Sequence, residues 1–322
     1  MMVRTSAPGK LMLSGEYVVL EGAEALVTAV DRRLYAVGSA RRDDGSPQRG
    51  SGSPGRGTLP PEALLAREYA EAVVGVTDME LTVDASALRR GDRKLGLGSS
   101  SAASAAAAAA VVAWHGGDPA ARRPEILGWA LAGHRAVAPQ GSGADVAAAT
   151  LGGVVRFSRE HAERAVTIEW PHTLHVEVVW TGKPARTSDL VAQVKTLEAD
   201  APGRYREVMR RLRDASEELL GAIVGGEARR AIEAADEHGA AMGALGEAAG
   251  APIVTETLAR VAELARAHRG GAKPSGAGGG DVALAFFDSA RDAARFRDAC
   301  ATNELALLPL ELGADGVRLE ET

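Results

Sequence analysis

The sequence has almost no cysteine and no long apolar run. Cys300 is the single cysteine among 322 residues, so no disulfide can form within the chain and a reducing compartment is expected. The opening residues, Met1 to Pro8, lack the apolar core of a secretory signal peptide. The longest apolar stretch, the alanine-rich run 102–113, is shorter than the roughly 20 residues of a membrane-spanning helix. We therefore expect a soluble, cytoplasmic protein with no membrane partner.

The chain also lacks an excess of positive charge. Its formal net charge is −6, which gives no support to a nucleic-acid partner. With 46% hydrophobic and 25% charged residues, the composition is that of an ordinary globular protein with a substantial core. A length of 322 residues is typical of about two domains.

Lysine is scarce as well. Of the 37 basic residues only five are lysine, namely Lys10, Lys94, Lys183, Lys195 and Lys273. Four of them stand next to glycine or proline motifs. A lysine ammonium is a compact charge on a flexible stem, and an arginine fork does not replace it. Its retention beside these motifs supports a function for those four, although chance could produce the same pattern.

Hydrophobic patterning predicts alternating strands and helices. Strands are expected around a turn within residues 3–40, and at 79–83, 154–157, 174–180, 282–287 and 305–312. Helices are expected at 61–74, 102–113, 119–138, after the loop 180–188, at 205–223, 227–248 and 252–268, and from a capping box at Ser289 to Cys300. Residues 41–61 are rich in Gly, Pro, Ser and Arg without periodicity, so we interpret them as a mobile surface loop. The last elements are typical of a small α+β domain with helices on one face of a sheet.

A glycine and serine loop before the alanine run is the strongest candidate for a binding site. The segment Lys94–Ser101 contains two glycines and three hydroxyls and leads into a helix, since alanine is the best helix former. Unpaired N–H groups and the positive end of the helix dipole make such a terminus an anion site. The lysine precedes the glycines, which differs from the Walker pattern. A simple glycine turn before a packing helix is the alternative.

Two further glycine-rich segments carry polar residues. Residues 140–149 open a second small-residue helix with Asp145 in its first turn, where an acid is also favoured by the helix dipole alone. Residues 273–281 form the third segment and lead into a strand. Near the N-terminus, Lys10 and Glu16 stand among apolar residues; the alternative for both is a strand end that faces water.

Taken together, Ala7–Lys10, Gly96–Ser100 and Ser275–Asp281 resemble the three signature motifs of the GHMP kinase superfamily, in the same order. The resemblance spans almost the whole chain. It implies an α+β, two-domain GHMP kinase fold, with an N-terminal domain like ribosomal protein S5 domain 2 (residues 1–170) and a ferredoxin-like C-terminal domain (171–322). It also implies a small-molecule substrate, with ATP and Mg²⁺ as cofactors.

The resemblance assigns roles to individual residues. Asp145 matches the catalytic aspartate, and Lys10 matches the lysine that pairs with it and would keep it charged. The expected ATP-binding residues are Lys94, Gly96, Leu97, Gly98, Ser99, Ser100 and Ser101, with Ser100 also near the metal. The expected substrate-binding residues are Glu16, Tyr17, Ser142, Gly143, Lys183, Arg186, Ser275, Gly276, Ala277 and Gly278.

Within the superfamily, several segments look most like those of phosphomevalonate kinases. Mevalonate kinases would show histidine where this chain has Tyr17, and a metal-binding glutamate where it has His134. The latter departure leaves the Mg²⁺ shell open. Diphosphomevalonate decarboxylases usually lack the lysine that Lys10 supplies. The alternatives are a mevalonate kinase, another GHMP small-molecule kinase, or a nucleotide-binding paralogue without catalysis.

A phosphorylated acceptor brings its own negative charge and calls for additional cations. Lys94, Lys183 and Arg186 are the candidates, and solvated loop charge is the alternative. The sequence leaves the oligomeric state open, with a homodimer among the options.

Overall fold

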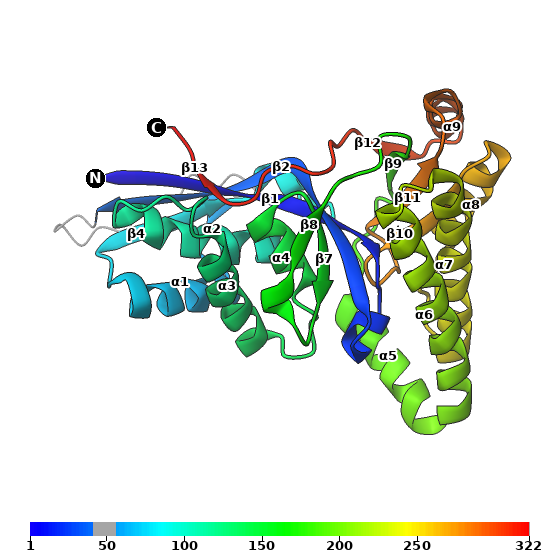
Figure 1. Ribbon diagram of the computed structural model, residues 1–322, viewed down its shortest axis with the longest axis horizontal. Helices are drawn as coiled ribbons and strands as arrows, with labels where there is room; N and C mark the ends of the chain where they lie inside the picture. Colours follow the sequence, from blue (N-terminus) through cyan, green and yellow to red (C-terminus); the bar gives the residue numbers. More distant parts are fainter. Residues whose placement is uncertain (41–55, 322) are drawn as a thin grey trace. The chain divides into compact units, whose positions relative to one another are not determined.

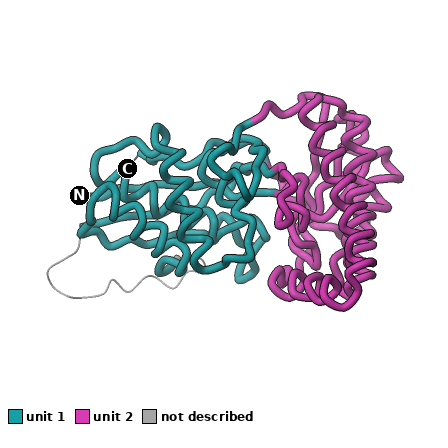
Figure 2. Tube along the Cα trace, turned by 60° about the horizontal axis from the view of Figure 1, so that its bottom comes forward, with its two compact units in different colours: residues 1–11, 27–167, 311–322 teal, residues 12–26, 168–310 magenta. Residues whose placement is uncertain are grey.

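The computed structural model describes residues 1–40 and 56–321 (Figure 1). The chain divides into two compact units, which Figure 2 colours separately. The first comprises residues 1–11, 27–167 and 311–322, and the second comprises residues 12–26 and 168–310. The predicted division at 170/171 has one boundary, whereas these units exchange two segments, 12–26 and 311–322. The predicted loop 41–61 lies mostly outside the described residues.

The described part of the first unit is built on a seven-stranded sheet with the order β13-β1-β2-β4-β3, in which β7 pairs with β2 and β8. The strands are β1 (Met2–Ser14), β2 (Glu24–Ala40), β3 (Arg56–Gly57), β4 (Met79–Asp84), β7 (Val154–Ser158), β8 (Val166–Ile168) and β13 (Arg318–Leu319). A separate hairpin joins β5 (Arg89–Arg90) to β6 (Arg93–Lys94). In β4, buried Met79, Leu81 and Val83 alternate with more exposed residues, as in a half-buried strand.

Helices of the first unit lie on one side of β1, β2 and β4 (Figure 1). They are α1 (Pro61–Val74), α2 (Ser99–Trp114), α3 (Arg123–Val137) and α4 (Ala144–Leu151), with short 3₁₀ turns η2 (Ser86–Leu88) and η3 (Ala162–Arg164). α2 is buried from Ser101 to Ala113 because its alanine side chains let α1, α3 and α4 pack closely around it. No helix in the described ranges is both long and apolar enough to span a membrane.

A four-stranded antiparallel sheet of order β10-β11-β9-β12 forms the base of the second unit. Its strands are β9 (His175–Trp180), β10 (Gly271–Ser275), β11 (Val282–Phe287) and β12 (Ala306–Leu308). The helices are α5 (Thr187–Asp200), α6 (Pro202–Val224), α7 (Ala228–Ala249), α8 (Glu256–Ala267) and α9 (Ala290–Thr302). The core of α8, α9 and the sheet includes Ala283, Ala285 and Phe287, alternate residues of β11 that share one face.

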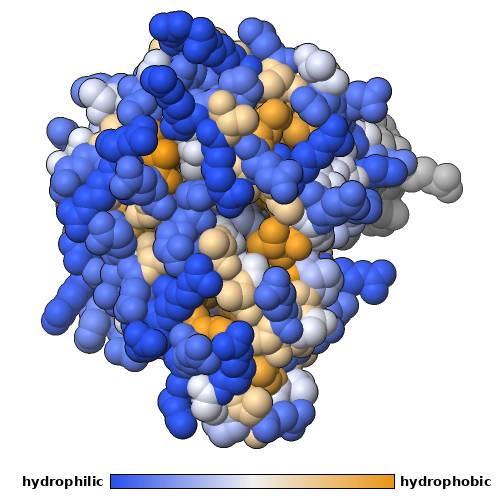
Figure 3. Space-filling model, turned by 90° about the vertical axis from the view of Figure 1, so that its right-hand side faces the viewer, coloured by the Kyte–Doolittle hydropathy of each residue, from blue (hydrophilic) through white to orange (hydrophobic). Residues whose placement is uncertain are grey.

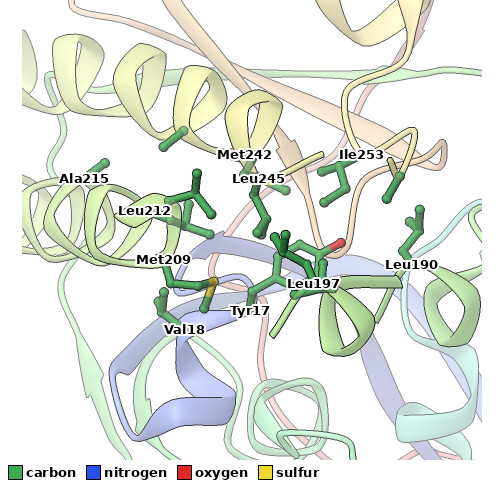
Figure 4. Close-up of a cluster of buried hydrophobic side chains, with 14 of the residues drawn as sticks. Tyr17, Val18, Leu190, Leu197, Met209, Leu212, Ala215, Met242, Leu245 and Ile253 are labelled. Carbon is green, nitrogen blue, oxygen red and sulfur yellow. The ribbon is translucent and has the colours of Figure 1, made fainter. Parts of the chain in front are cut away.

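A second apolar cluster joins α5, α6 and α7 to the segment that follows β1 (Figure 4). Tyr17 and Val18 enter this cluster beside Met209, Leu212 and Met242. The outer surface of the helices is mostly hydrophilic with smaller apolar patches between (Figure 3). The segment 12–26 is therefore part of the core of the second unit, although it lies near the N-terminus.

Two predicted strands differ from the structure. The apolar run after Tyr17 forms a 3₁₀ turn, η1 (Val18–Glu21), because Gly15 (φ +103°) and Tyr17 (φ +62°) turn the chain before it can extend. The predicted strand 305–312 ends at Leu308, since Pro309 has no N–H for the sheet. The other predicted strands and helices are present, with the predicted bounds in α1 and β11 and with shifted ends elsewhere.

Candidate active site

The loop before α2 presents an open helix N-terminus in the first unit. Gly96 (φ +78°) and Gly98 (φ +72°) flank Leu97, which is buried and anchors the loop. The first backbone bond of the helix runs from Ala102 N–H to the Gly98 carbonyl (3.0 Å), and no side chain caps the terminus. The N–H groups of residues 99–101 therefore precede the helical ladder, and the positive end of the helix dipole adds to their attraction for an anion.

Lys10 of β1 lies directly over this loop. Its backbone N–H donates to the Leu97 carbonyl (3.0 Å), which ties β1 to the loop. A Cβ atom on Gly98 would lie 2.8 Å from Cγ and Cε of Lys10. The lysine stem thus occupies the space that any larger residue at position 98 would need.

Asp145 meets Lys10 at the start of α4. Gly143 (φ +86°) is the N-cap of this helix and Asp145 lies in its first turn, as predicted. Lys10 Nζ lies 3.1 Å from Asp145 Oδ2, so the predicted ion pair is present. The Lys10 side chain is 9% exposed, whereas that of Asp145 is 36% exposed. The carboxylate is accessible to a ligand, while the ammonium is held beneath it.

The backbone of the turn before Asp145 packs closely against side chains of α3. The Ser142 hydroxyl accepts from Ala144 N–H (3.2 Å), and a Cβ on Gly143 would lie 2.6 Å from Leu131 Cδ2. His134 of α3 lies beside this turn, where its Nε2 would be 2.6 Å from a Cβ on Gly141. The described residues contain no cluster of three His, Cys, Asp or Glu side chains that could hold a metal ion.

The second unit gathers the other predicted residues around the glycine loop 276–280. Gly278 and Gly280 have no room for a side chain, since a Cβ would lie 2.3 Å from the Ile253 carbonyl and 2.5 Å from the Lys183 carbonyl respectively. Asp281 N–H donates to the same Lys183 carbonyl (2.8 Å). The loop that carries Lys183 and Arg186 is therefore joined to the glycine loop, and both cations are exposed.

Tyr17 and Ser275 contribute their side chains to the structure of this region. The Ser275 hydroxyl accepts from Met12 N–H (2.8 Å) and donates to the Met12 carbonyl (3.0 Å). The Tyr17 hydroxyl donates to the Ala277 carbonyl (2.6 Å), and burial raises the pKa of Tyr17. Their predicted substrate contacts stay predictions, because in this structure both hydroxyls are engaged by the backbone.

A buried polar cluster at the base of the same loop was not predicted. The Glu16 carboxylate accepts from Lys273 Nζ and from Gly276 N–H (3.2 Å), and its second oxygen lies 3.4 Å from His238 Nε2. The three side chains are at most 1% exposed. Burial raises the pKa of Glu16, against the opposing effect of Lys273. Burial, together with the charge of Lys273, lowers the pKa of His238 well below 6.5.

A signal for Lys273 exists in the sequence, since it is one of the rare lysines beside a glycine motif. His238 carries no such signal, because a histidine on the inner face of an amphipathic helix is usually part of the packing. The predicted residues thus form two groups: Lys10, Asp145 and the loop 94–101 lie in the first unit, and Glu16, Tyr17, Lys183, Arg186 and residues 275–278 lie in the second.

Comparison with known proteins gives consistent matches in both halves of the chain. The model of the GHMP kinase N-terminal domain matches residues 63–153, and that of the GHMP kinase C-terminal domain matches residues 228–305. The phosphomevalonate kinase of Streptomyces sp. (strain CL190) is 29% identical, with 97% of each chain covered. The mevalonate kinase of Aeropyrum pernix is also 29% identical, over 99% of this chain and 98% of the relative.

The fold is shared with a solved structure, Streptococcus pneumoniae phosphomevalonate kinase in complex with phosphomevalonate and AMPPNP. The two chains superpose with a TM-score of 0.77 at 20% identity, over 97% of this chain and 99% of the other. At this level of identity the match describes the fold, which is the predicted α+β fold with two GHMP domains.

Proposed function

The chain belongs to the GHMP kinase family, and we propose that it is an ATP-dependent kinase that converts 5-phosphomevalonate to 5-diphosphomevalonate. One observation carries the kinase assignment. The Lys10–Asp145 pair (3.1 Å) lies over a glycine loop that opens the N-terminus of α2. Phosphoryl transfer needs little covalent chemistry from the protein beyond positioning and charge stabilisation, and these groups supply both.

In this mechanism the loop 96–101 binds ATP phosphates through backbone N–H groups. Lys10 lies next to Gly98, where its ammonium can stabilise negative charge that develops during transfer. Asp145 holds the attacking oxygen of the acceptor and takes its proton if one is present. A phosphate monoester has its second pKa near 6 and is mostly ionised at neutral pH, so positioning is the larger task for this acceptor.

The residues present fit a magnesium ion only as partial ligands. The Ser100 hydroxyl and the partly exposed Asp145 carboxylate are the candidate oxygen ligands. Mg²⁺ commonly keeps several waters and binds through one or two protein oxygens together with substrate phosphates, which this donor set allows. When bound, the ion would neutralise charge on the β- and γ-phosphates.

The choice of acceptor rests on the relatives and on two departures from the mevalonate kinase pattern, Tyr17 and His134. Lys94 of the first unit and Lys183 and Arg186 of the second are exposed, and each is proposed as a candidate for contact with the phosphate that the acceptor already carries. Mevalonate is the second candidate, because a mevalonate kinase matches at the same identity as a phosphomevalonate kinase.

A panel of acceptors tests the proposal. We expect ADP release from Mg-ATP with 5-phosphomevalonate and little with mevalonate, galactose or homoserine. Turnover with mevalonate alone would keep the kinase and overturn the acceptor. ATP binding without turnover on any acceptor would favour a nucleotide-binding protein without catalysis.

A further inference from the structure

The buried cluster of Glu16, Lys273 and His238 takes no direct part in the chemistry above. We propose that His238 is a positioning residue, which orients the Glu16 carboxylate and through it sets the start of the glycine loop 276–280. The kinetic consequences of this proposal rest on the proposed function. Its structural part concerns the second unit alone and can be tested without any substrate.

Unpartnered polar atoms within the described residues point to this role. Glu16 Oε2 and both ring nitrogens of His238 are buried without a hydrogen-bond partner there. Such atoms are rare in native interiors, because a buried polar group without a partner is costly. Glu16 Oε2 and His238 Nε2 face each other at 3.4 Å. With a proton on Nε2, a small approach of the two side chains would pair these atoms and leave Nδ1 as the one unpartnered atom of this cluster.

The charge balance requires the imidazole to be neutral. Lys273 and Glu16 form an oppositely charged pair, and a charged His238 would add an uncompensated cation to a fully buried site. Burial and the charge of Lys273 lower the pKa of His238 accordingly. A neutral imidazole has one N–H, and only the Nε2 tautomer directs it to Glu16.

The Glu16 carboxylate connects His238 to the glycine loop through a hydrogen bond. Its other oxygen, Oε1, accepts from both Lys273 Nζ and Gly276 N–H. Gly276 (φ +87°) is the first residue of the loop, and the next residue, Ala277, is bound by Tyr17. Rotation of the Glu16 carboxylate would therefore move the Gly276 amide and with it the predicted acceptor-binding residues.

His238 is placed firmly enough for this task. The next residue, Gly239, packs against β10 so closely that a Cβ would lie 2.5 Å from the Ala272 carbonyl. The α7 backbone therefore meets the backbone of the strand that carries Lys273. This close packing fixes the position of the His238 ring relative to the strand that leads into the glycine loop, as a positioning role requires.

Three variants separate positioning from packing. His238→Leu removes the donor, and His238→Gln keeps an amide donor in place of Nε2. Met242→Ala creates a cavity one turn further along α7 in the apolar cluster.

We expect His238→Leu to raise KM for 5-phosphomevalonate about tenfold, with KM for ATP changed by less than about twofold. Small displacements of positioning groups have effects of this size or larger. His238→Gln should recover most of the loss. Equal kinetics for His238→Leu and Met242→Ala, or no recovery with His238→Gln, would overturn the proposal.

Two measurements without substrate complete the test. Nitrogen NMR of histidine-labelled protein should show His238 as a neutral Nε2–H tautomer, and a Nδ1–H tautomer or an imidazolium at neutral pH would refute the assignment. Hydrogen exchange of peptides spanning 273–281 should accelerate in His238→Leu and stay near wild type in His238→Gln and Met242→Ala. If the wild type turned over no acceptor, the proposed function would fail while these two results still decided the role of His238.

Discussion

In the described residues each unit has a lysine–carboxylate pair at its glycine-rich motifs, and the two pairs differ in exposure. Lys10 and Asp145 are 9% and 36% exposed, whereas Lys273 and Glu16 are 0% and 1% exposed. The Asp145 carboxylate is partly exposed to solvent. Glu16 directs its oxygens to Lys273, Gly276 and His238 inside the protein.

This difference separates a pair suited to chemistry from a pair suited to structure. An accessible ion pair contributes little to stability, because water and salt screen it. A buried pair need not stabilise the fold either, yet removal of one partner leaves an uncompensated charge and is strongly destabilising. Substitutions in the accessible pair should therefore affect mainly turnover, and substitutions in the buried pair should affect mainly stability.

The largest expected effect is on turnover. Asp145→Asn should lower kcat by about 10²- to 10⁴-fold, since the proposed mechanism places this carboxylate at the reacting atoms. Affinity for ATP and the melting temperature should change little, because this side chain is partly exposed. Asp292→Asn is the matched control, as Asp292 is likewise an acid in the first turn of a helix. If both variants kept full activity, Asp145 would be only a helix-terminal acid.

The next effect is on stability, where substitution in the buried pair should cost more than substitution in the accessible pair. Glu16→Gln should lower the free energy of unfolding by about 3–5 kcal/mol, because the Lys273 charge stays buried without its partner. Lys10→Met should cost less than about 1 kcal/mol, since its partner is accessible to water. Urea unfolding of both variants measures the contrast. Similar losses for the two would show that burial does not distinguish these pairs.

The smallest effect is a pH dependence specific to the buried cluster. The folded-state pKa of His238 lies well below its ordinary value of 6.5, so the unfolded chain binds a proton there that the native state does not. Stability from this group is present above pH 6.5 and is lost as the pH falls towards the folded pKa, by up to about 1.4 kcal/mol per pH unit.

His238→Gln removes this titration and should flatten the acid side of the stability curve. Burial raises the pKa of Glu16, an effect of opposite sign that is present in both proteins, so the difference between the curves isolates His238. Urea unfolding of both proteins at several pH values between 7.5 and 5 measures this difference in unfolding free energy. Parallel curves would mean that His238 is protonated as readily in the native state as in the unfolded chain.

Local chemistry explains what could be predicted about the binding loop. Gly96 and Gly98 before an alanine run predict a glycine turn followed by a helix, because both depend on neighbours in the chain. Asp145 in a first helical turn follows in the same way from the glycines before it. The resemblance to a family then supplied the pairing of Lys10 with Asp145, which spacing alone does not indicate.

The roles of Glu16 and His238 could not be predicted in this way. Their positions in the chain are 222 residues apart, and only the packing of α7 against β10 brings the imidazole to the carboxylate. Burial then decides which groups are charged, since desolvation acts through the whole surroundings of a side chain. The exchange of residues 12–26 and 311–322 between the units has the same origin, because the partners of these segments lie far along the chain.

By itself, the sequence determined the turns, helices and strands whose causes lie within a few residues, together with the motifs that carry the family resemblance. The tertiary structure alone decided that Asp145 is accessible while Glu16 is enclosed. The physical reason is that exposure, and with it the energy of a charge, depends on contacts between distant segments, which no local pattern records.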